Sequence, residues 1–455
     1  MEGIFVKEKS FYKNIFFLTF PLVFQQLLRL SVDTLNSMML GNIDQLQMSA
    51  VSQANQVFFI FYTVCSGFGV GCCALVAQYW GKQDIDAIKT VLAAALRYTA
   101  VLGLIVTAIV MLAPESVMRI YSSDPELIAL GAGYLRIVAI MYTPCALSVM
   151  LFAGCRGIEQ VGIFFKTNVI SYPLNIFLNY CFLFGAFGFP RLGITGIAIA
   201  TIIARLTELL ILSVYVLFID KRMSFKLRDL LRRDKTLSKD LAVVAAPIVA
   251  HEIIWSFGTS AGSMITGQLG TGVVAGFNVT TVLYDLCGSL GNGFLNACSV
   301  VIGKTIGMGK VDKVKKQAQT ILVMGLILGL AIGLFTFLIR GAFLSLYDLT
   351  PEASGYAMQF MAVYAVIWPF SLLEMVGMIA ILRAGGDGKT GFYTDIVSMW
   401  LTTIPLAAAG AFIFGWPPVV VVTVIKLTIV IEAIVGIIRV LSMRWVHDLT
   451  RHKTA

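Results

Sequence analysis

Two carboxylic acids lie inside long apolar stretches, where a charged side chain is costly. Asp33 lies well within the first of these stretches, and Glu252 lies near the middle of a later one. A carboxylate at the centre of a bilayer costs about 2.5 kcal/mol or more. Because burial favours the neutral form and a nearby cation favours the charged form, such a group can bind and release a proton or Na⁺. For Asp33 the alternative is a structural ion pair with Arg29, one helical turn earlier.

Glu252 belongs to a second set of polar residues that could line a cavity. Its counterpart in the repeat described below is Gln26, so this position is polar in both halves of the chain. A position that is polar in both copies favours a cavity over a lipid-facing surface, and a buried, hydrogen-bonded acid is the alternative. His251 is predicted to be a local partner of Glu252, with proton relay as its other interpretation. The predicted second-lobe site comprises Gln26, His251, Glu252, Trp255, Asp285 and Glu374.

Several other charges are interpreted as structural. Arg205 with Glu208 and Lys426 with Glu432 are predicted pairs, although the second pair is loosely spaced for one helix face. Asp395 lies close to the end of its apolar stretch, so a capping or interfacial role is predicted for it.

Membrane-spanning helices must position these residues. Hydrophobic residues make up 58% of the chain and charged residues 13%, against about 25% charged in soluble proteins. Runs such as 321–339 and 419–438 are long enough to cross a bilayer as helices. Roughly twelve such stretches are predicted. They start near residues 14, 54, 92, 130, 164, 194, 241, 278, 318, 356, 391 and 419.

The chain repeats itself at an offset of 226 residues, which becomes 227 where residues 165–168 align with residues 392–395. Landmarks recur 226 positions later (247 − 21 = 226), as in Pro21 and Pro247, Cys72 and Cys298, Gly81 and Gly307, and Tyr121 and Tyr347. Shared apolar composition would not align glycines, prolines and cysteines. Six spans return each half to its starting side, so the halves are predicted to share orientation. The expected fold is an all-α integral membrane protein with 12 transmembrane helices in two like-oriented six-helix repeats.

The basic residues are unevenly distributed. Of the 34 Lys and Arg, most fall in segments on one predicted side, including the stretch 221–239. This asymmetry is typical of cytoplasmic loops and predicts that both termini are cytoplasmic. The predicted domains are an N-terminal six-helix lobe at 1–220, a cytoplasmic linker at 221–239 and a C-terminal six-helix lobe at 240–455.

Other functional classes fit poorly. The basic residues follow the membrane topology, which argues against nucleic acid as a partner, despite the net charge of +9. The segment 385–390 ends like a phosphate-binding loop, but Arg383 occupies the place of its first glycine. The three histidines have no metal-ligand spacing, so an enzyme is not expected, and neither is a cofactor. The eight cysteines lie in apolar stretches and are predicted to be buried. Transport would then need an ion gradient or a partner for energy.

From about residue 13 to 445, the chain resembles the multidrug and toxic compound extrusion (MATE) family in its bacterial form. The features that carry the resemblance are the two like-oriented halves, Val32-Asp33-Thr34, Trp80-Gly81-Lys82, the paired loops at 151–157 and 383–387, and His251-Glu252-Ile253-Ile254-Trp255. The resemblance implies a V-shaped bundle whose lobes open alternately to each side. It also implies efflux of bulky, often cationic drugs, driven by inward flow of Na⁺ or H⁺.

The resemblance also implies a cation-coupling site in the N-terminal lobe. Its members are Asp33, Asn175, Asn179 and Thr201. The family often has an acid where this chain has Asn179, so a proton shared by two carboxylates is not available there. Oxygens from these four residues could still coordinate Na⁺, which favours Na⁺ as the coupling ion and leaves a proton route through Glu252 open.

The alternative function is a dedicated exporter or flippase of one metabolite, peptide or lipid-linked precursor on the same scaffold. In either case we expect the partners to be the lipid bilayer and small organic substrates. A monomer in a bacterial plasma membrane would suffice, because one chain contains both lobes.

Overall fold

The computed structural model describes residues 5–40 and 45–451, without the side chains of residues 33, 34, 37, 38, 40 and 45. Within that part of the chain, every regular element is a helix. The elements of the first half are α1 (Lys9–Leu40), α2 (Gln45–Gly81), α3 (Ile85–Leu112), α4 (Pro114–Met118), α5 (Pro125–Val138), η1 (Ala139–Met141), α6 (Tyr142–Gly157), α7 (Gly162–Phe184), η2 (Ala186–Gly188), α8 (Ile194–Val214), η3 (Tyr215–Ile219) and η4 (Leu227–Leu231).

The second half follows the same plan. Its elements are α9 (Lys235–Gly267), α10 (Thr271–Gly307), α11 (Val311–Leu344), α12 (Pro351–Glu374), η5 (Met375–Leu382), α13 (Gly388–Asp395), η6 (Ile396–Thr403), α14 (Ile404–Phe412) and α15 (Pro418–Leu441). Adding 226 to the first residue numbers of α1, α2, α3, α5 and α7 gives those of α9, α10, α11, α12 and α13. The predicted internal repeat is therefore present in the helices themselves.

The helices can account for the predicted membrane spans. In the described part of the chain, eleven helical segments are long and apolar enough to cross a bilayer. The remaining long helix, α7, has 23 residues and is therefore about 34 Å long, enough for a twelfth span. Its hydropathy is reduced by three buried asparagines, Asn168, Asn175 and Asn179.

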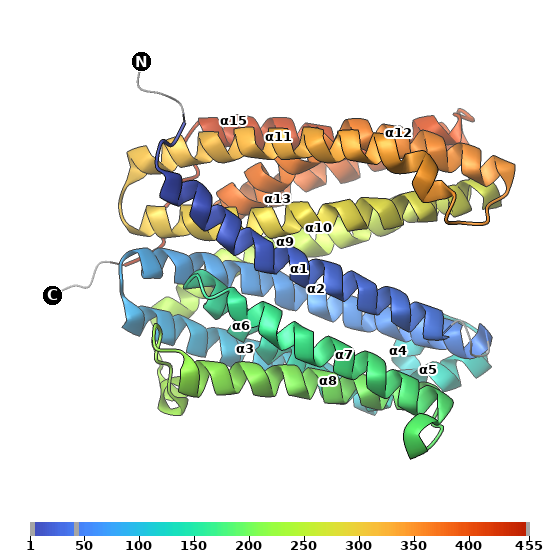
Figure 1. The fold of residues 1–455 in the computed structure, drawn as a ribbon, viewed down its shortest axis with the longest axis horizontal. Helices are drawn as coiled ribbons and strands as arrows, with labels where there is room; N and C mark the ends of the chain where they lie inside the picture. The colour runs from blue at the N-terminus through green and yellow to red at the C-terminus, as the bar shows by residue number, and fades with distance from the viewer. Residues whose placement is uncertain (1–4, 41–44, 452–455) are drawn as a thin grey trace. The chain divides into compact units, whose positions relative to one another are not determined.

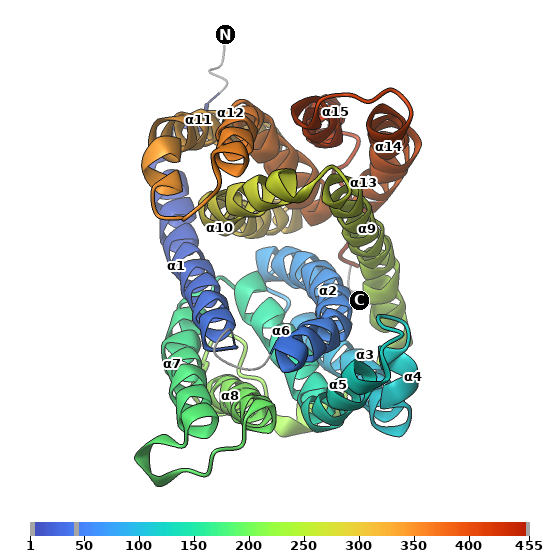
Figure 2. The ribbon, with the colours of Figure 1, turned by 90° about the vertical axis from the view of Figure 1, so that its right-hand side faces the viewer.

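The helices form two compact units (Figures 1 and 2). The N-terminal unit is Phe24–Ala245, and the C-terminal unit is Met1–Val23 with Ala246–Ala455. The division within α1 falls just after Pro21, which lacks the N–H donor of a helical hydrogen bond. In the N-terminal unit α7 and α8 run side by side, as do α11 and α12 in the C-terminal unit (Figure 1).

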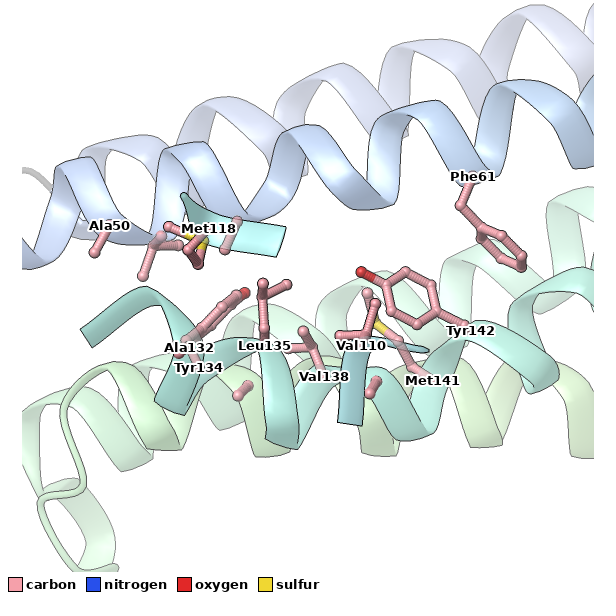
Figure 3. Close-up of a cluster of buried hydrophobic side chains, with 14 of the residues drawn as sticks. Ala50, Phe61, Val110, Met118, Ala132, Tyr134, Leu135, Val138, Met141 and Tyr142 are labelled. Atoms are coloured by element: carbon pink, nitrogen blue, oxygen red, sulfur yellow. The ribbon is translucent and has the colours of Figure 1, made fainter. Parts of the chain in front are cut away.

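Each unit has its own apolar core. In the N-terminal unit, Tyr142 lies edge-on to Phe61, with ring centroids 5.0 Å apart. Figure 3 shows these rings together with Val110, Leu135 and other buried side chains from α2, α3, α5 and α6. The eight cysteines are buried and free, as predicted.

The linker before α9 is held against α3. The guanidinium of Arg97 donates to the carbonyl oxygens of Leu230 at 2.6 Å and Arg232 at 2.7 Å. Burial acts to raise the pKa of Asp229, but the backbone N–H of Lys226 and the side chain of Arg232 outweigh it and hold that pKa below its ordinary value. The charged η4 segment is therefore an ordered part of the N-terminal unit.

Candidate functional site

A cluster of three asparagines lies inside the N-terminal unit. The amide of Asn36 on α1 donates to Oδ1 of Asn175 on α7 at 3.2 Å. The amide of Asn179 donates to Oδ1 of Asn36 at 2.8 Å and to Oδ1 of Asn175 at 3.2 Å. Oδ1 of Asn179 is buried and has no hydrogen-bond partner among the described residues. We call Asn36, Asn175 and Asn179 the amide cluster.

The helices explain why these residues meet. Asn175 and Asn179 are four residues apart, so they lie on one face of α7, and both are buried as predicted. Asn36 was not predicted, although it lies three residues after Asp33 on the same face of α1. The side chain of Asp33 lies outside the described residues. Its backbone position on α1 is one turn from the amide cluster.

Two other predicted residues of this unit are not joined to the amide cluster by a described contact. The hydroxyl of Thr201 on α8 donates to the carbonyl of Ile197 in its own helix at 2.9 Å. Gln26 is partly buried on α1.

A line of buried polar groups continues along α7 from the amide cluster. Thr167, Asn168 and Ser171 are each at most 1% exposed, and each has a side-chain polar atom with no partner among the described residues. Asn168, Ser171, Asn175 and Asn179 recur at intervals of three or four and so form one face. This face is turned into the protein, where polar groups are costly without a role.

A second and larger cluster lies in the C-terminal unit. Nη1 of Arg383 donates to Oε1 of Glu252 at 2.7 Å, and the Arg383 side chain is only 4% exposed. Nη2 of the same guanidinium lies 2.9 Å from Nδ1 of His251. His251 and Glu252 are adjacent on α9, and Arg383 follows η5, so the guanidinium joins two spans. The predicted local partnership of His251 and Glu252 thus runs through Arg383, a residue that sequence reasoning left unassigned.

The contact with Arg383 fixes the protonation of His251. A guanidinium has only donors, so Nδ1 must accept, and the neutral imidazole carries its proton on Nε2. Nε2 lies 3.3 Å from Oδ2 of Asp395 on α13. Asp395 is fully buried, which corrects the prediction that it caps its helix or lies at the interface.

Two further acids complete this group. Glu432 on α15 accepts a hydrogen bond from the hydroxyl of Ser398 at 2.8 Å and interacts electrostatically with Asp395. Glu374, at the end of α12, interacts electrostatically with Arg383, Glu252 and Glu432. We call Glu252, Glu374, Asp395 and Glu432 the carboxyl cluster. Two π-helical segments, η5 and η6, begin directly after Glu374 and Asp395, and π-helical turns are frequent at functional sites.

Trp255 and Asp285 are the remaining predicted residues of this unit. Trp255 on α9 is 42% exposed. Asp285 on α10 interacts electrostatically with Lys426. The ammonium of Lys426 lies 4.6 Å from the ring centroid of Tyr364 and 5.1 Å from that of Tyr284. Lys426 is therefore held by aromatic rings, and not by Glu432 as predicted.

The other predicted structural pair is present. Nη1 of Arg205 lies 2.8 Å from Oε2 of Glu208 within α8. A surface hollow of about 830 Å³ near Arg119 and Tyr121 shares no residue with either cluster.

Comparison with known proteins finds the same family in both halves of the chain. The MatE family model matches residues 21–181 and 247–409, one match in each half. A probable multidrug resistance protein NorM of Rhizobium meliloti is 26% identical over 310 residues, which are 68% of this chain and 66% of that protein. The multidrug resistance protein MdtK of Pectobacterium atrosepticum is 25% identical over 399 residues, which are 85% of each chain.

Solved structures show the same fold. An outward-facing multidrug resistance MATE transporter of the MOP superfamily superposes with a TM-score of 0.86 at 19% identity, covering 97% of this chain and 99% of that one. A MATE crystal structure in complex with MaL6 also gives 0.86 at 19% identity, covering 95% and 97%. Because the family model matches well over half of its residues, the chain belongs to the MatE (MATE) family and is a multi-pass membrane transporter.

Proposed function

We propose that this protein is a cation-coupled antiporter that exports bulky, often cationic organic compounds from a bacterial cell by alternating access. Relatives named as multidrug resistance proteins support the substrate class. The coupling is supported by the two polar clusters, one in each unit, because buried polar groups inside spans mark ion and substrate paths.

The observation that carries the coupling proposal is the excess of acids in the carboxyl cluster. The cluster comprises four carboxyl groups, one of which, that of Glu252, accepts from the guanidinium of Arg383, and His251 is neutral while Arg383 donates to its Nδ1. An uncompensated carboxylate in a low-dielectric interior is costly, so the cluster must take up cations to balance its charge. A site that gains or loses a proton as its surroundings change is what an ion-driven transporter needs.

The amide cluster supplies a second candidate coupling site. Amide oxygens are hard ligands of the kind that alkali cations prefer, and the unpartnered Oδ1 of Asn179 is free to serve as one. Asp33, Asn175, Asn179 and Thr201 are the residues that would hold Na⁺ there. The coupling ion would then be Na⁺ at the amide cluster or H⁺ at the carboxyl cluster.

The remaining features of the proposal follow from the distribution of charge. The basic linker at 221–239 supports, under the positive-inside rule, a cytoplasmic location of both termini in a bacterial cell. One chain contains both units, so a monomer is sufficient, and no cofactor other than the coupling ion is needed.

The test is transport of a fluorescent organic cation in proteoliposomes under an inward Na⁺ gradient and, separately, under an inward proton gradient. The wild type is compared with Asp33→Asn and Glu252→Gln. We expect one gradient to drive export and at least one variant to lose that drive. Export that needs neither gradient, in a well-folded wild type, would refute the proposal.

A further inference from the structure

The carboxyl cluster contains a pair of acids, Asp395 and Glu432, for which the described residues supply no ion pair with a lysine or arginine. Asp395 is 0% exposed and Glu432 is 5% exposed. Neither oxygen of Asp395 receives a hydrogen bond from a donor in the described part of the chain. Glu432 receives one from Ser398, a neutral hydroxyl. Ser398 lies one helical turn after Asp395, so its hydrogen bond to Glu432 places the two acids on the same side of that helix. The two carboxyl groups interact electrostatically, and a hydrogen bond between them needs a proton on one of them.

The groups that face this pair do not balance its charge. Glu374 adds a further acid, and Arg383, whose guanidinium donates to Glu252, is the nearest fixed cation. His251 faces Asp395 with the protonated Nε2 of a neutral ring, as its contact with Arg383 requires. Two buried carboxylates side by side without a cation are strongly unfavourable, which leaves one of them protonated.

The position of Glu432 can be compared with its counterpart in the first repeat, where the acid has a structural partner. The helix starts of α8 and α15 differ by 224 (418 − 194), which aligns Glu432 with Glu208. Glu208 pairs with Arg205 at 2.8 Å, but Ile429 stands at the position of that arginine in the second repeat. The second repeat thus keeps the acid and lacks its cation.

The position of Asp395, the other acid of the pair, also differs between the two repeats. With the 227-residue offset of this region, Asp395 aligns with Asn168 and Ser398 aligns with Ser171 (395 − 168 = 227; 398 − 171 = 227). The first repeat therefore has a neutral amide where the second has an acid. The second repeat therefore differs from the first in two ways, since it has an acid in place of an amide at Asp395 and no arginine beside the acid at Glu432.

We propose that Asp395 and Glu432 together bind one exchangeable proton within the C-terminal unit, at a site distinct from Glu252 and from the amide cluster. The proposed ligand is a proton, because a hydrogen bond between two carboxyl groups needs a proton on one of them. His251 is the positioning residue that links this pair to Arg383 and Glu252. The role of this site in transport rests on the proposed cation-coupled function, because the proton bound here would be the coupling ion.

Infrared spectroscopy tests the site directly. The carboxyl C=O stretch of a protonated acid is recorded in pH-difference spectra of the purified full-length protein. The variants are Asp395→Asn, which installs the residue of the first repeat, and Glu432→Gln, which can keep the hydrogen bond to Ser398. Glu208→Gln is the matched control, because that acid is paired with Arg205. Thermal melting of each variant confirms that it is folded.

We expect a protonated-carboxyl band in the wild type that disappears in Asp395→Asn and in Glu432→Gln and persists in Glu208→Gln. Persistence of the whole band in both test variants would overturn the proposal. In proteoliposomes, we expect each test variant to reduce proton-gradient-driven export by about tenfold or more, the equivalent of one pKa unit of lost proton affinity. A wild type with the band but without proton-driven export would leave the proton site standing and refute proton coupling in the proposed function.

Discussion

Replacing Arg383 with methionine is the sharpest test of the carboxyl cluster. Methionine keeps an unbranched side chain at this position but removes the guanidinium that contacts Glu252 at 2.7 Å and His251 at 2.9 Å. The change leaves Glu252 as an uncompensated acid and Nδ1 of His251 without a donor. We expect the variant to be less stable than the wild type at neutral pH.

The size of the loss can be worked out from burial. Breaking a buried ion pair costs about 3–5 kcal/mol. The Arg383 side chain is 4% exposed, but that of Glu252 is 23% exposed and keeps some hydration, which favours the lower end of this range. A loss of about 3 kcal/mol corresponds to a fall in Tm of roughly 3–6 °C, since the shift per kcal/mol decreases as chain length increases.

The assay is thermal unfolding in detergent across a range of pH. Protonation can neutralise Glu252 in the variant, so the difference in Tm from the wild type should narrow as the pH falls. Arg439→Met is the control, because Arg439 is 32% exposed and also donates to a carboxylate, that of Asp387. We expect that control to cost about 0–1 kcal/mol, as partly exposed pairs do.

The double variant Arg383→Met with Glu252→Gln tests whether the loss comes from the uncompensated charge of Glu252. Removing the acid as well as the cation removes the uncompensated charge, so most of the lost stability should return. A Tm for Arg383→Met equal to that of the wild type at neutral pH would refute the reasoning. So would a double variant no more stable than the single one.

Three further predictions concern other parts of the chain. Asn179→Ala removes an amide that donates two hydrogen bonds, so it should lower the Tm through a loss of about 1–3 kcal/mol of stability. If Na⁺ is the coupling ion, added Na⁺ should also protect this variant less against thermal unfolding than it protects the wild type. The pKa of Asp229 is held below its ordinary value of 3.8, so its contribution to stability is full at neutral pH and is lost as the pH falls through that lowered pKa. We therefore expect Asp229→Asn to be less stable than the wild type at neutral pH. In a series of melting curves at different pH, the variant should lack this part of the acid dependence. Tyr364→Leu removes one aromatic face from the ammonium of Lys426 and should cost about 2 kcal/mol or more in chemical unfolding, since this cation is desolvated.

The fold was largely predictable because its evidence is local and repeated. Apolar length predicts a span without knowledge of its neighbours, and the offset between Pro21 and Pro247 is readable in the sequence. The span that hydropathy identifies least well is α7, because of its buried polar residues. Its asparagines are buried in the protein interior, and these members of the candidate site lower the hydropathy of the helix.

The candidate sites were predictable only where spacing alone placed the residues. Asn175 and Asn179 share a helix face by their four-residue spacing, and the structure places them together. The position of Asp395 depends on how α13 packs against α9, more than a hundred residues earlier, which no local pattern encodes. The six-residue spacing of Lys426 and Glu432 puts them on different faces of α15, and they have different partners.

The most direct test of the central claim is the reverse experiment, in which the substrate drives the ion. Wild-type protein is reconstituted without any ion gradient, an outward gradient of a fluorescent organic cation is imposed, and the internal pH and Na⁺ are followed with indicator dyes. Antiport predicts that outward movement of the organic cation draws H⁺ or Na⁺ inward, and that the ion flux stops when the substrate gradient collapses. Substrate movement with no ion movement in the opposite direction would contradict cation-coupled export.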